Sequence, residues 1–378
     1  MSPDGSFEYA EMNPAKKPKK RKLRHRPKWF RVLQAIALSR IFALFAAIFF
    51  VIWILYYLSF TMPSNSTTLI LPEAVNFIQI DRICTPPEDA IRDCYVVSDY
   101  VNSKTNEAWR MTRSEKGTNG SELESHFSRV ALIVQNDTSP SSEWSIDHST
   151  ILGKYLAVMA TMPFTLDSFQ AAIPRILSVG LGGGVLDMFL HFKRPRFEIT
   201  VAEIDKTIVE IAHKWYGVEE TTKRKTITEN GIDVLSNTVK NGALFDAIFI
   251  DACNLTSFDS TCPVEAFAEK SNVADVSDSL QKQGSVVVNV VARSNGTEKY
   301  YEKVLSTYLY YFPLCLKATM PTGNIVLACA KSFRNSDDEN TLRDKITNRW
   351  NDAANDLGLR EMLKSVNITV IVKSQKYY

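Results

Sequence analysis

The chain has 378 residues, a hydrophobic fraction of 45% and a formal net charge of +2 at pH 7. These values exclude a disordered chain and allow one large domain or two modest ones. The charge is unevenly spread, because residues 1–31 carry ten Lys and Arg against three acidic residues, whereas residues 41–378 carry 33 basic and 39 acidic ones. Such a mildly acidic remainder is not typical of a nucleic-acid-binding protein, so we expect no nucleic-acid partner.

The N-terminal part is predicted to be a disordered, basic tail at residues 1–31, followed by a transmembrane helix at residues 36–62. The twenty residues 41–60 contain no charged side chain, and at about 1.5 Å of rise each they match the thickness of a bilayer core. Residues 16–31 are strongly basic and residues 61–81 contain no Lys or Arg, so the positive-inside rule places the tail in the cytosol. The basic run 16–22 also fits a nuclear import signal, an alternative that the sequence leaves open.

Two features beyond the predicted span indicate an oxidising, glycosylating compartment. All six cysteines lie there, and their spacing is compatible with pairs Cys84–Cys94 and Cys315–Cys329, although ordinary buried thiols are the alternative. Six N-glycosylation sequons also lie there, at Asn65, Asn119, Asn136, Asn254, Asn295 and Asn367. We therefore expect a single-pass type II membrane protein of the endoplasmic reticulum, Golgi or cell surface, with its folded domain in the lumen.

Residues 63–145 are predicted to form a small β-rich region. Apolar residues alternate with polar ones near 74–83 and 129–134, and Ser, Thr and Asn are frequent between these runs. Residues 146–162 carry apolar side chains at helical spacing and are predicted to lead, as a helix, into the main domain at 146–378.

Apolar runs alternate with helical stretches from residue 175 onward. Strands are predicted at 176–179, 198–201, 226–228, 247–250, 285–291, 315–318 and 324–330, and helices at 207–216, 297–311 and 342–357. This alternation is typical of an α/β fold with a doubly wound, mostly parallel, seven-stranded sheet. Only a short turn separates the last two strands, so they are predicted to pair as an antiparallel hairpin at one edge of the sheet.

A glycine-rich loop follows the first of these strands and precedes a predicted helix. It reads Gly-Leu-Gly-Gly-Gly at 180–184, and Glu203 lies at the end of the next predicted strand. Glycines at such a junction let the backbone approach a ligand closely, and the acidic residue suits a ribose. The spacing departs from the Gly-x-Gly-x-x-Gly of dinucleotide sites, which together with the terminal hairpin favours S-adenosylmethionine over NAD or FAD. A purely structural turn is the alternative.

Further motifs extend this pattern along the chain. They lie at 147–149, 179–184, 202–205, 230–231, 245–251 and 262–263, with Tyr155 ahead of the glycine loop. Together they resemble the spermidine-synthase-like class I methyltransferases, and within that family the C-terminal domain of the methyltransferase-like 13 proteins. The resemblance covers about residues 146–370 and implies an S-adenosylmethionine-dependent methyltransferase.

The resemblance also assigns roles in cofactor binding. Glu203 is expected to accept hydrogen bonds from both ribose hydroxyls, and Asn230 to face the adenine amino group at a position where the family usually has Asp. Ile204 and Ile232 are expected to sandwich the adenine ring, and Asp205 to cap the next helix. The expected cofactor-binding residues are Gly180, Gly182, Gly183, Gly184, Glu203, Asn230 and Gly231. No metal ligand is expected.

Asp251 is the expected catalytic residue, because the resemblance places it where the methyl donor and the acceptor meet. It is expected to orient the acceptor or take its proton. Aminopropyltransferases of this family carry a second carboxylate three residues later, where this chain has Asn254, so aminopropyl transfer is the less favoured activity. The acceptor is unidentified, with a protein amine suggested by the resemblance, and a homodimer is compatible with the sequence. A catalytically inactive binding domain is the alternative, since the sequon at Asn254 lies at the mouth of the expected site.

Overall fold

The computed structural model describes residues 75–88, 93–115, 126–135, 139–254, 261–292, 296–332 and 338–373. The predicted basic tail and the predicted transmembrane helix at 36–62 lie outside these residues. Within them, no helix combines the length and the apolar character that a membrane crossing requires. All described residues belong to one compact unit, Leu71–Tyr378.

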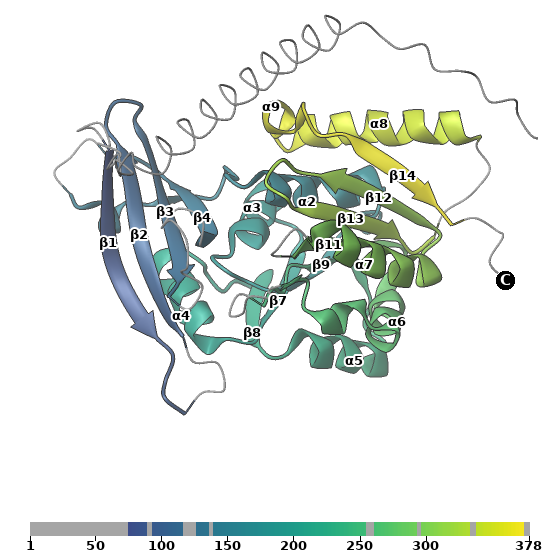
Figure 1. The fold of residues 1–378 in the computed structure, drawn as a ribbon, viewed down its shortest axis with the longest axis horizontal. Helices are drawn as coiled ribbons and strands as arrows, with labels where there is room; N and C mark the ends of the chain where they lie inside the picture. The colour runs from purple at the N-terminus through teal and green to yellow at the C-terminus, as the bar shows by residue number, and fades with distance from the viewer. Residues whose placement is uncertain are drawn as a thin grey trace, which may run out of the picture. The chain divides into compact units, whose positions relative to one another are not determined.

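An antiparallel five-stranded sheet forms the N-terminal part of this unit (Figure 1). Its strands pair in chain order, and they are β1 (Val75–Cys84), β2 (Cys94–Asn102), β3 (Glu107–Ser114), β4 (His126–Leu132) and β5 (Ile146–Asp147). A disulfide joins Cys84 to Cys94, which are direct partners across β1 and β2. The first four strands fall within the segment predicted to be β-rich. β2 and β3 were not recognised from the sequence, because buried polar residues interrupt their apolar pattern. Asp99 of β2 and Arg110 of β3 are two of these residues, and they form an ion pair at 2.8 Å.

A larger mixed sheet forms the centre of the second part. Its strands are β6 (Arg175–Val179), β7 (Glu198–Glu203), β8 (Arg224–Thr228), β9 (Phe245–Ile250), β10 (Thr261–Cys262), β11 (Leu280–Ala292), β12 (Leu314–Thr319), β13 (Ile325–Ala330) and β14 (Ile368–Val372). The order is β14-β12-β13-β11-β9-β6-β7-β8, with β10 paired to β11. The pairs from β8 to β11 are parallel, and those involving β10, β12, β13 and β14 are antiparallel. The seven predicted strands are therefore present in a doubly wound arrangement.

Two predictions about this sheet were incomplete. Within the described ranges the sheet has nine strands rather than seven, because β10 and β14 were missed. The hairpin β12–β13 is also not at the edge, since β14 pairs with β12 outside it. β10 is only two residues long and β14 lies near the end of the chain, so neither carries a long periodic signal. The hairpin itself is as predicted and carries a disulfide between Cys315 and Cys329.

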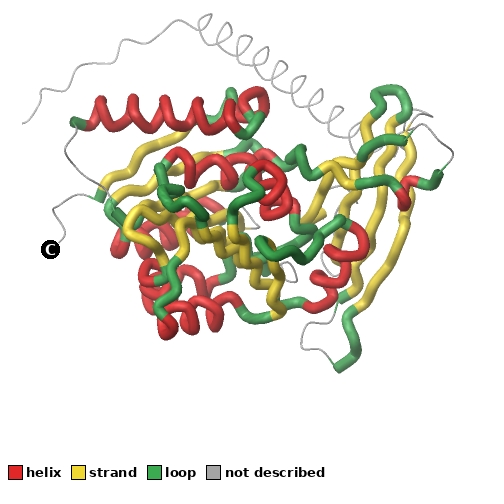
Figure 2. Tube along the Cα trace, turned by 180° about the vertical axis from the view of Figure 1, so that it is seen from behind, coloured by secondary structure: helices red, strands yellow, loops and turns green. Residues whose placement is uncertain are grey.

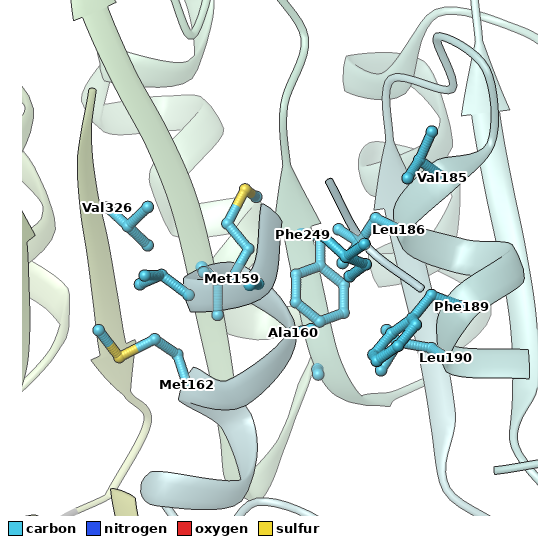
Figure 3. Close-up of a cluster of buried hydrophobic side chains, with 14 of the residues drawn as sticks. Met159, Ala160, Met162, Val185, Leu186, Phe189, Leu190, Phe249 and Val326 are labelled. Atoms are coloured by element: carbon cyan, nitrogen blue, oxygen red, sulfur yellow. The ribbon is translucent and has the colours of Figure 1, made fainter. Parts of the chain in front are cut away.

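Helices cover both faces of the larger sheet (Figures 1 and 2). They are α2 (Lys154–Thr165), α3 (Val185–Lys193), α4 (Lys206–Trp215), α5 (Gly231–Asn241), α6 (Lys270–Asp278), α7 (Thr297–Tyr311), α8 (Glu339–Asp356) and α9 (Arg360–Leu363), with short 3₁₀ helices at Ser141–Glu143 and Glu265–Ala268. One hydrophobic cluster packs α2, α3, α4 and α8 on one face, and a second packs α5, α6 and α7 on the other. Figure 3 shows the first cluster, where Met159 of α2 and Phe189 of α3 lie near Phe249 of β9.

The helix predicted at 146–162 begins later than expected. Residues Ile146–Asp147 form β5, which pairs with β4, and α2 starts only at Lys154. Asp147 explains the difference, because its carboxylate accepts hydrogen bonds from the Ser149 amide and the Thr150 hydroxyl at 2.9 and 2.7 Å. These local bonds favour a turn over a helix at this point. β5 thereby leads the chain from the N-terminal sheet into the α/β fold.

Candidate functional site

A cavity of about 540 Å³ lies at the carboxyl ends of β6, β7 and β9. Ligands in open α/β sheets bind at this edge, at the point where the strand order reverses. Here the crossover after β6 leads to β7 on one side of it, and the crossover after β8 returns to β9 on its other side. The cavity wall includes most of the predicted site, namely Gly180, Gly182, Glu203, Ile204, Asn230, Gly231, Ile232 and Asp251. Residues that are distant in sequence are thus brought together as expected.

The glycine loop approaches the end of β9 very closely. Gly180 has a φ of 96°, and a Cβ atom built there would lie 2.6 Å from the backbone oxygen of Asp251. Gly183 and Gly184 do not line the cavity. The Gly183 amide donates to Ser128 Oγ of the N-terminal sheet at 2.8 Å, and Gly184 is the left-handed residue before α3. These two glycines therefore let the loop pack against neighbouring elements rather than face a ligand.

Glu203 is the last residue of β7 and its carboxylate is held in place by the backbone. Its two oxygens accept hydrogen bonds from the amides of Leu181 and Asp205, each at 2.9 Å. Burial raises the pKa of Glu203, and these backbone bonds oppose the rise. Because each carboxylate oxygen has a second lone pair, both can still accept a hydroxyl of a ligand. The geometry fits the predicted ribose contact.

Asn230 begins α5 and its side-chain oxygen accepts the Ile232 amide at 3.0 Å as a helix cap. The oxygen expected to meet an adenine amino group therefore already has one partner, although it retains a second lone pair. Ile204 is 58% exposed while lining the cavity. Ile232 lines the cavity as well, so the two apolar side chains expected to contact the adenine ring are both available to it. Asp205 caps α4 as predicted, accepting the Thr207 amide at 2.8 Å.

Asp251 follows β9 directly and receives two side-chain hydrogen bonds. Tyr155 of α2 donates its hydroxyl to Oδ2 at 3.3 Å, and Asn289 of β11 donates its amide to Oδ1 at 2.8 Å. Burial raises the pKa of Asp251 to about 6, and the two hydrogen bonds act in the opposite direction. Its carboxylate can therefore accept or release a proton near neutral pH. Tyr155 was part of the sequence pattern, whereas Asn289 was missed because an Asn inside an apolar strand carries no motif.

Acidic side chains dominate the charged part of the cavity wall. They are Asp93, Asp187, Glu203, Asp205 and Asp251, and the described residues that line the cavity include no Lys, Arg or His. Asp187 is compensated by Arg224, which lies behind it at 2.8 Å and is fully buried. The remaining carboxylates favour a ligand with positive charge.

The N-terminal sheet closes one side of the cavity through Asp93, Tyr95, Phe127 and Ser128. The Tyr95 hydroxyl donates to Asp205 at 2.6 Å, and Tyr95 packs edge-on against Phe127. Sequence reasoning missed these four residues. They precede the recognisable motifs in the chain. The alternation of apolar and polar residues in β2 and β4 predicts strands, but it does not show that these strands face a cavity of the α/β fold.

A third disulfide joins Cys253 to Cys262 beside Asp251. The donor atoms of these three residues are close enough together for a metal site. However, a metal requires thiolates, whereas both sulfurs here are bonded to each other, so we assign no metal to them. Asn254, the sequon residue, is exposed and lines the cavity, as expected for a position at its mouth.

The fold and the cavity define a class I methyltransferase-like domain. No family model matches the chain. The chain is 28% identical over 219 residues to the eEF1A lysine and N-terminal methyltransferase of Xenopus laevis, covering 54% of this chain and 30% of that protein. It is 31% identical over 143 residues to the protein of the same name from Homo sapiens, covering 37% and 20%. The chain thus spans less than a third of the length of these curated relatives.

The chain is also similar to two solved structures. Human methyltransferase-like protein 13 in complex with SAH has a TM-score of 0.43 at 24% identity and covers 59% of this chain and 94% of that one. Spermidine synthase from Thermotoga maritima has a TM-score of 0.45 at 14% identity and covers 75% and 88%. Taken together, these sequence and structure matches confirm the expected resemblance to the spermidine-synthase-like class I methyltransferases, including methyltransferase-like protein 13.

Proposed function

We propose that this domain is an S-adenosylmethionine-dependent methyltransferase. The main support is that the glycine loop, the Glu203 carboxylate and Asp251 all line one cavity, with Glu203 held by backbone hydrogen bonds. The matched relatives are named methyltransferases, which supports the same reading. When bound, S-adenosylmethionine supplies an electrophilic methyl group on a positively charged sulfur, and an acid-lined wall suits that charge.

The acceptor that fits best is an amine of a protein. The relatives are named for a lysine and an N-terminal amine of eEF1A, and the acidic wall favours a cationic group over a carboxylate or phosphate. An amine must lose its proton before its lone pair can attack a methyl group. Asp251, with a pKa of about 6, is placed to accept that proton and to orient the nitrogen, while Tyr155 fixes its second oxygen.

The compartment is part of the proposal. We infer a single-pass type II membrane protein whose domain faces the lumen of the endoplasmic reticulum or Golgi, or the cell surface. All six cysteines are joined in three disulfides, which supports an oxidising compartment. Protease protection and glycosidase sensitivity of the full-length chain test this topology. A glycan mapped to Asn254 would block the cavity and favour a non-catalytic role.

Isothermal titration of the full chain in detergent with S-adenosylmethionine and S-adenosylhomocysteine tests cofactor binding. We expect micromolar affinity, and we expect Glu203→Ala to abolish it because both ribose contacts are lost. Glu210→Ala is the matched control, since Glu210 is an exposed residue of α4 outside the cavity. If the unaltered chain binds neither compound at millimolar concentration, the enzyme proposal is wrong and a non-catalytic interaction domain takes its place.

A further inference from the structure

A chain of amide side chains runs from the surface of the α/β fold to Asp251. Asn324, which precedes β13, donates its amide to Asn289 Oδ1 at 3.0 Å, and Asn289 donates to Asp251 Oδ1 at 2.8 Å. Thr322, in the exposed turn between β12 and β13, donates to Asn324 Oδ1 at 3.2 Å. Asn289 lies within β11, whereas Asn324 and Thr322 lie in the connection from β12 to β13, and β11 pairs with β13 in the sheet. None of them lines the cavity.

The direction of this chain follows from the donors and acceptors available. An ionised carboxylate only accepts hydrogen bonds, so it requires the NH₂ group of Asn289 to face it. The oxygen of Asn289 then points to Asn324, which must present its own NH₂ group, and its oxygen in turn accepts from Thr322. Each amide is thus held in one of its two orientations by the next one. Asn289 is 2% exposed, so a reversed amide would leave a buried oxygen facing the carboxylate.

We propose that Asn289 and Asn324 are positioning residues that fix the orientation of Asp251 and favour its ionised form. This inference rests on the proposed methyltransferase function. With Oδ1 bound by Asn289, the Oδ2 atom and its Tyr155 partner remain for the acceptor. An ionised Asp251 stabilises a positively charged sulfur in the cavity and can take a proton from an amine. The hairpin β12–β13 therefore contributes to the site without touching a ligand.

The charge of Asp251 can be followed by comparing a charged ligand with a neutral one, because few other groups contact its carboxylate. Tyr155 on α2 is titratable, Asn289 on β11 is neutral, and Cys253 and Cys262 are joined in a disulfide. S-adenosylmethionine carries a charged sulfur, whereas S-adenosylhomocysteine carries a neutral one and is otherwise the same. The ratio of their dissociation constants therefore reports the charge on the carboxylates that line the cavity, Glu203 included, and does not depend on knowing the acceptor. Glu203 is the same in every variant, so a change of the midpoint between variants reports Asp251.

The test is to measure both dissociation constants for the full chain between about pH 5 and about pH 8 by isothermal titration. In the unaltered chain, we expect the preference for the charged compound to rise with pH, with a midpoint near 6. In Asn324→Asp, the new carboxylate can only accept hydrogen bonds, so the NH₂ group of Asn289 turns toward it. The oxygen of Asn289 then faces Asp251, which loses its hydrogen-bond donor. We expect the midpoint to move up by about one pH unit. Asn289→Asp places a second carboxylate against Asp251, and its midpoint should also rise.

Asn340→Asp is the matched control, because it adds the same charge on an exposed residue of α8 and should leave the midpoint unchanged. Asn324 is half-buried and precedes a strand, whereas Asn289 is buried, so Asn324→Asp should disturb folding less than Asn289→Asp. Unchanged binding of S-adenosylhomocysteine verifies that a variant is folded. If both compounds bind but neither Asn289→Asp nor Asn324→Asp moves the midpoint, the positioning role is wrong while the proposed function stands. If neither compound binds the unaltered chain, the proposed function fails and the positioning role fails with it.

Discussion

Gly180→Ala is the substitution whose consequence the structure defines most sharply. The residue has a φ of 96°, and its new Cβ atom would lie 2.6 Å from the Asp251 backbone oxygen and 2.9 Å from its backbone carbon. An L-residue in this conformation is disfavoured by about 1–2 kcal/mol. Relieving the overlap displaces backbone rather than a flexible side chain, at about 1–3 kcal/mol. The free energy of unfolding should therefore fall by about 2–5 kcal/mol.

Gly242→Ala provides the matched control for this prediction. Gly242 also has a positive φ, of 64°, but a Cβ atom there meets nothing within 4 Å. It should lose only the backbone contribution, about 1–2 kcal/mol, and keep its affinity for S-adenosylhomocysteine. Gly180→Ala should lose at least tenfold in that affinity, because the loop and the end of β9 must separate.

Denaturant unfolding and isothermal titration of both variants measure these effects. The steric argument would be refuted if the two variants lost equal stability, or if Gly180→Ala bound S-adenosylhomocysteine like the unaltered chain. Either result would mean that the loop and β9 are not in close contact at the cavity.

Three further predictions concern the charged and covalent contacts of the fold. The pKa of Asp251 is raised from 3.8 to about 6, so its ionisation destabilises the fold as the pH rises through that window. In denaturant at pH 8, Asp251→Asn should have a free energy of unfolding about 3 kcal/mol higher than that of the unaltered chain, with no difference below about pH 4, and methyl transfer should be lost. Asp187→Ala should lower the free energy of unfolding by about 1–3 kcal/mol in denaturant, because the buried Arg224 would lose one of two ion-pair partners and keep Glu220; an unchanged free energy of unfolding would contradict this. Replacing Cys315 and Cys329 together by Ala should cost about 2–4 kcal/mol, and reducing agent should then have a smaller effect on the melting temperature than in the unaltered chain.

Much of the α/β fold was predictable because its strands are buried on both faces and read as short apolar runs between helices. The strand before the glycine loop, the helix at Thr297–Tyr311 and the β12–β13 hairpin were recognised in this way. Glu203 and Asp251 were recognised because both follow such runs, and parallel strands end at one edge of the sheet. The predictions for the membrane segment and for the side of the membrane remain predictions.

The sequence by itself determined the order of seven strands of the larger sheet, the glycine loop and the acidic residues at the strand ends, because these depend on local periodicity and short spacing. Only the tertiary structure decided what surrounds them. The cavity is closed by Tyr95 from another sheet, and Asp251 is held by Asn289 from a strand 38 residues away. Such contacts depend on which faces and ends of distant elements meet, and a single polar residue within an apolar run does not reveal its partner.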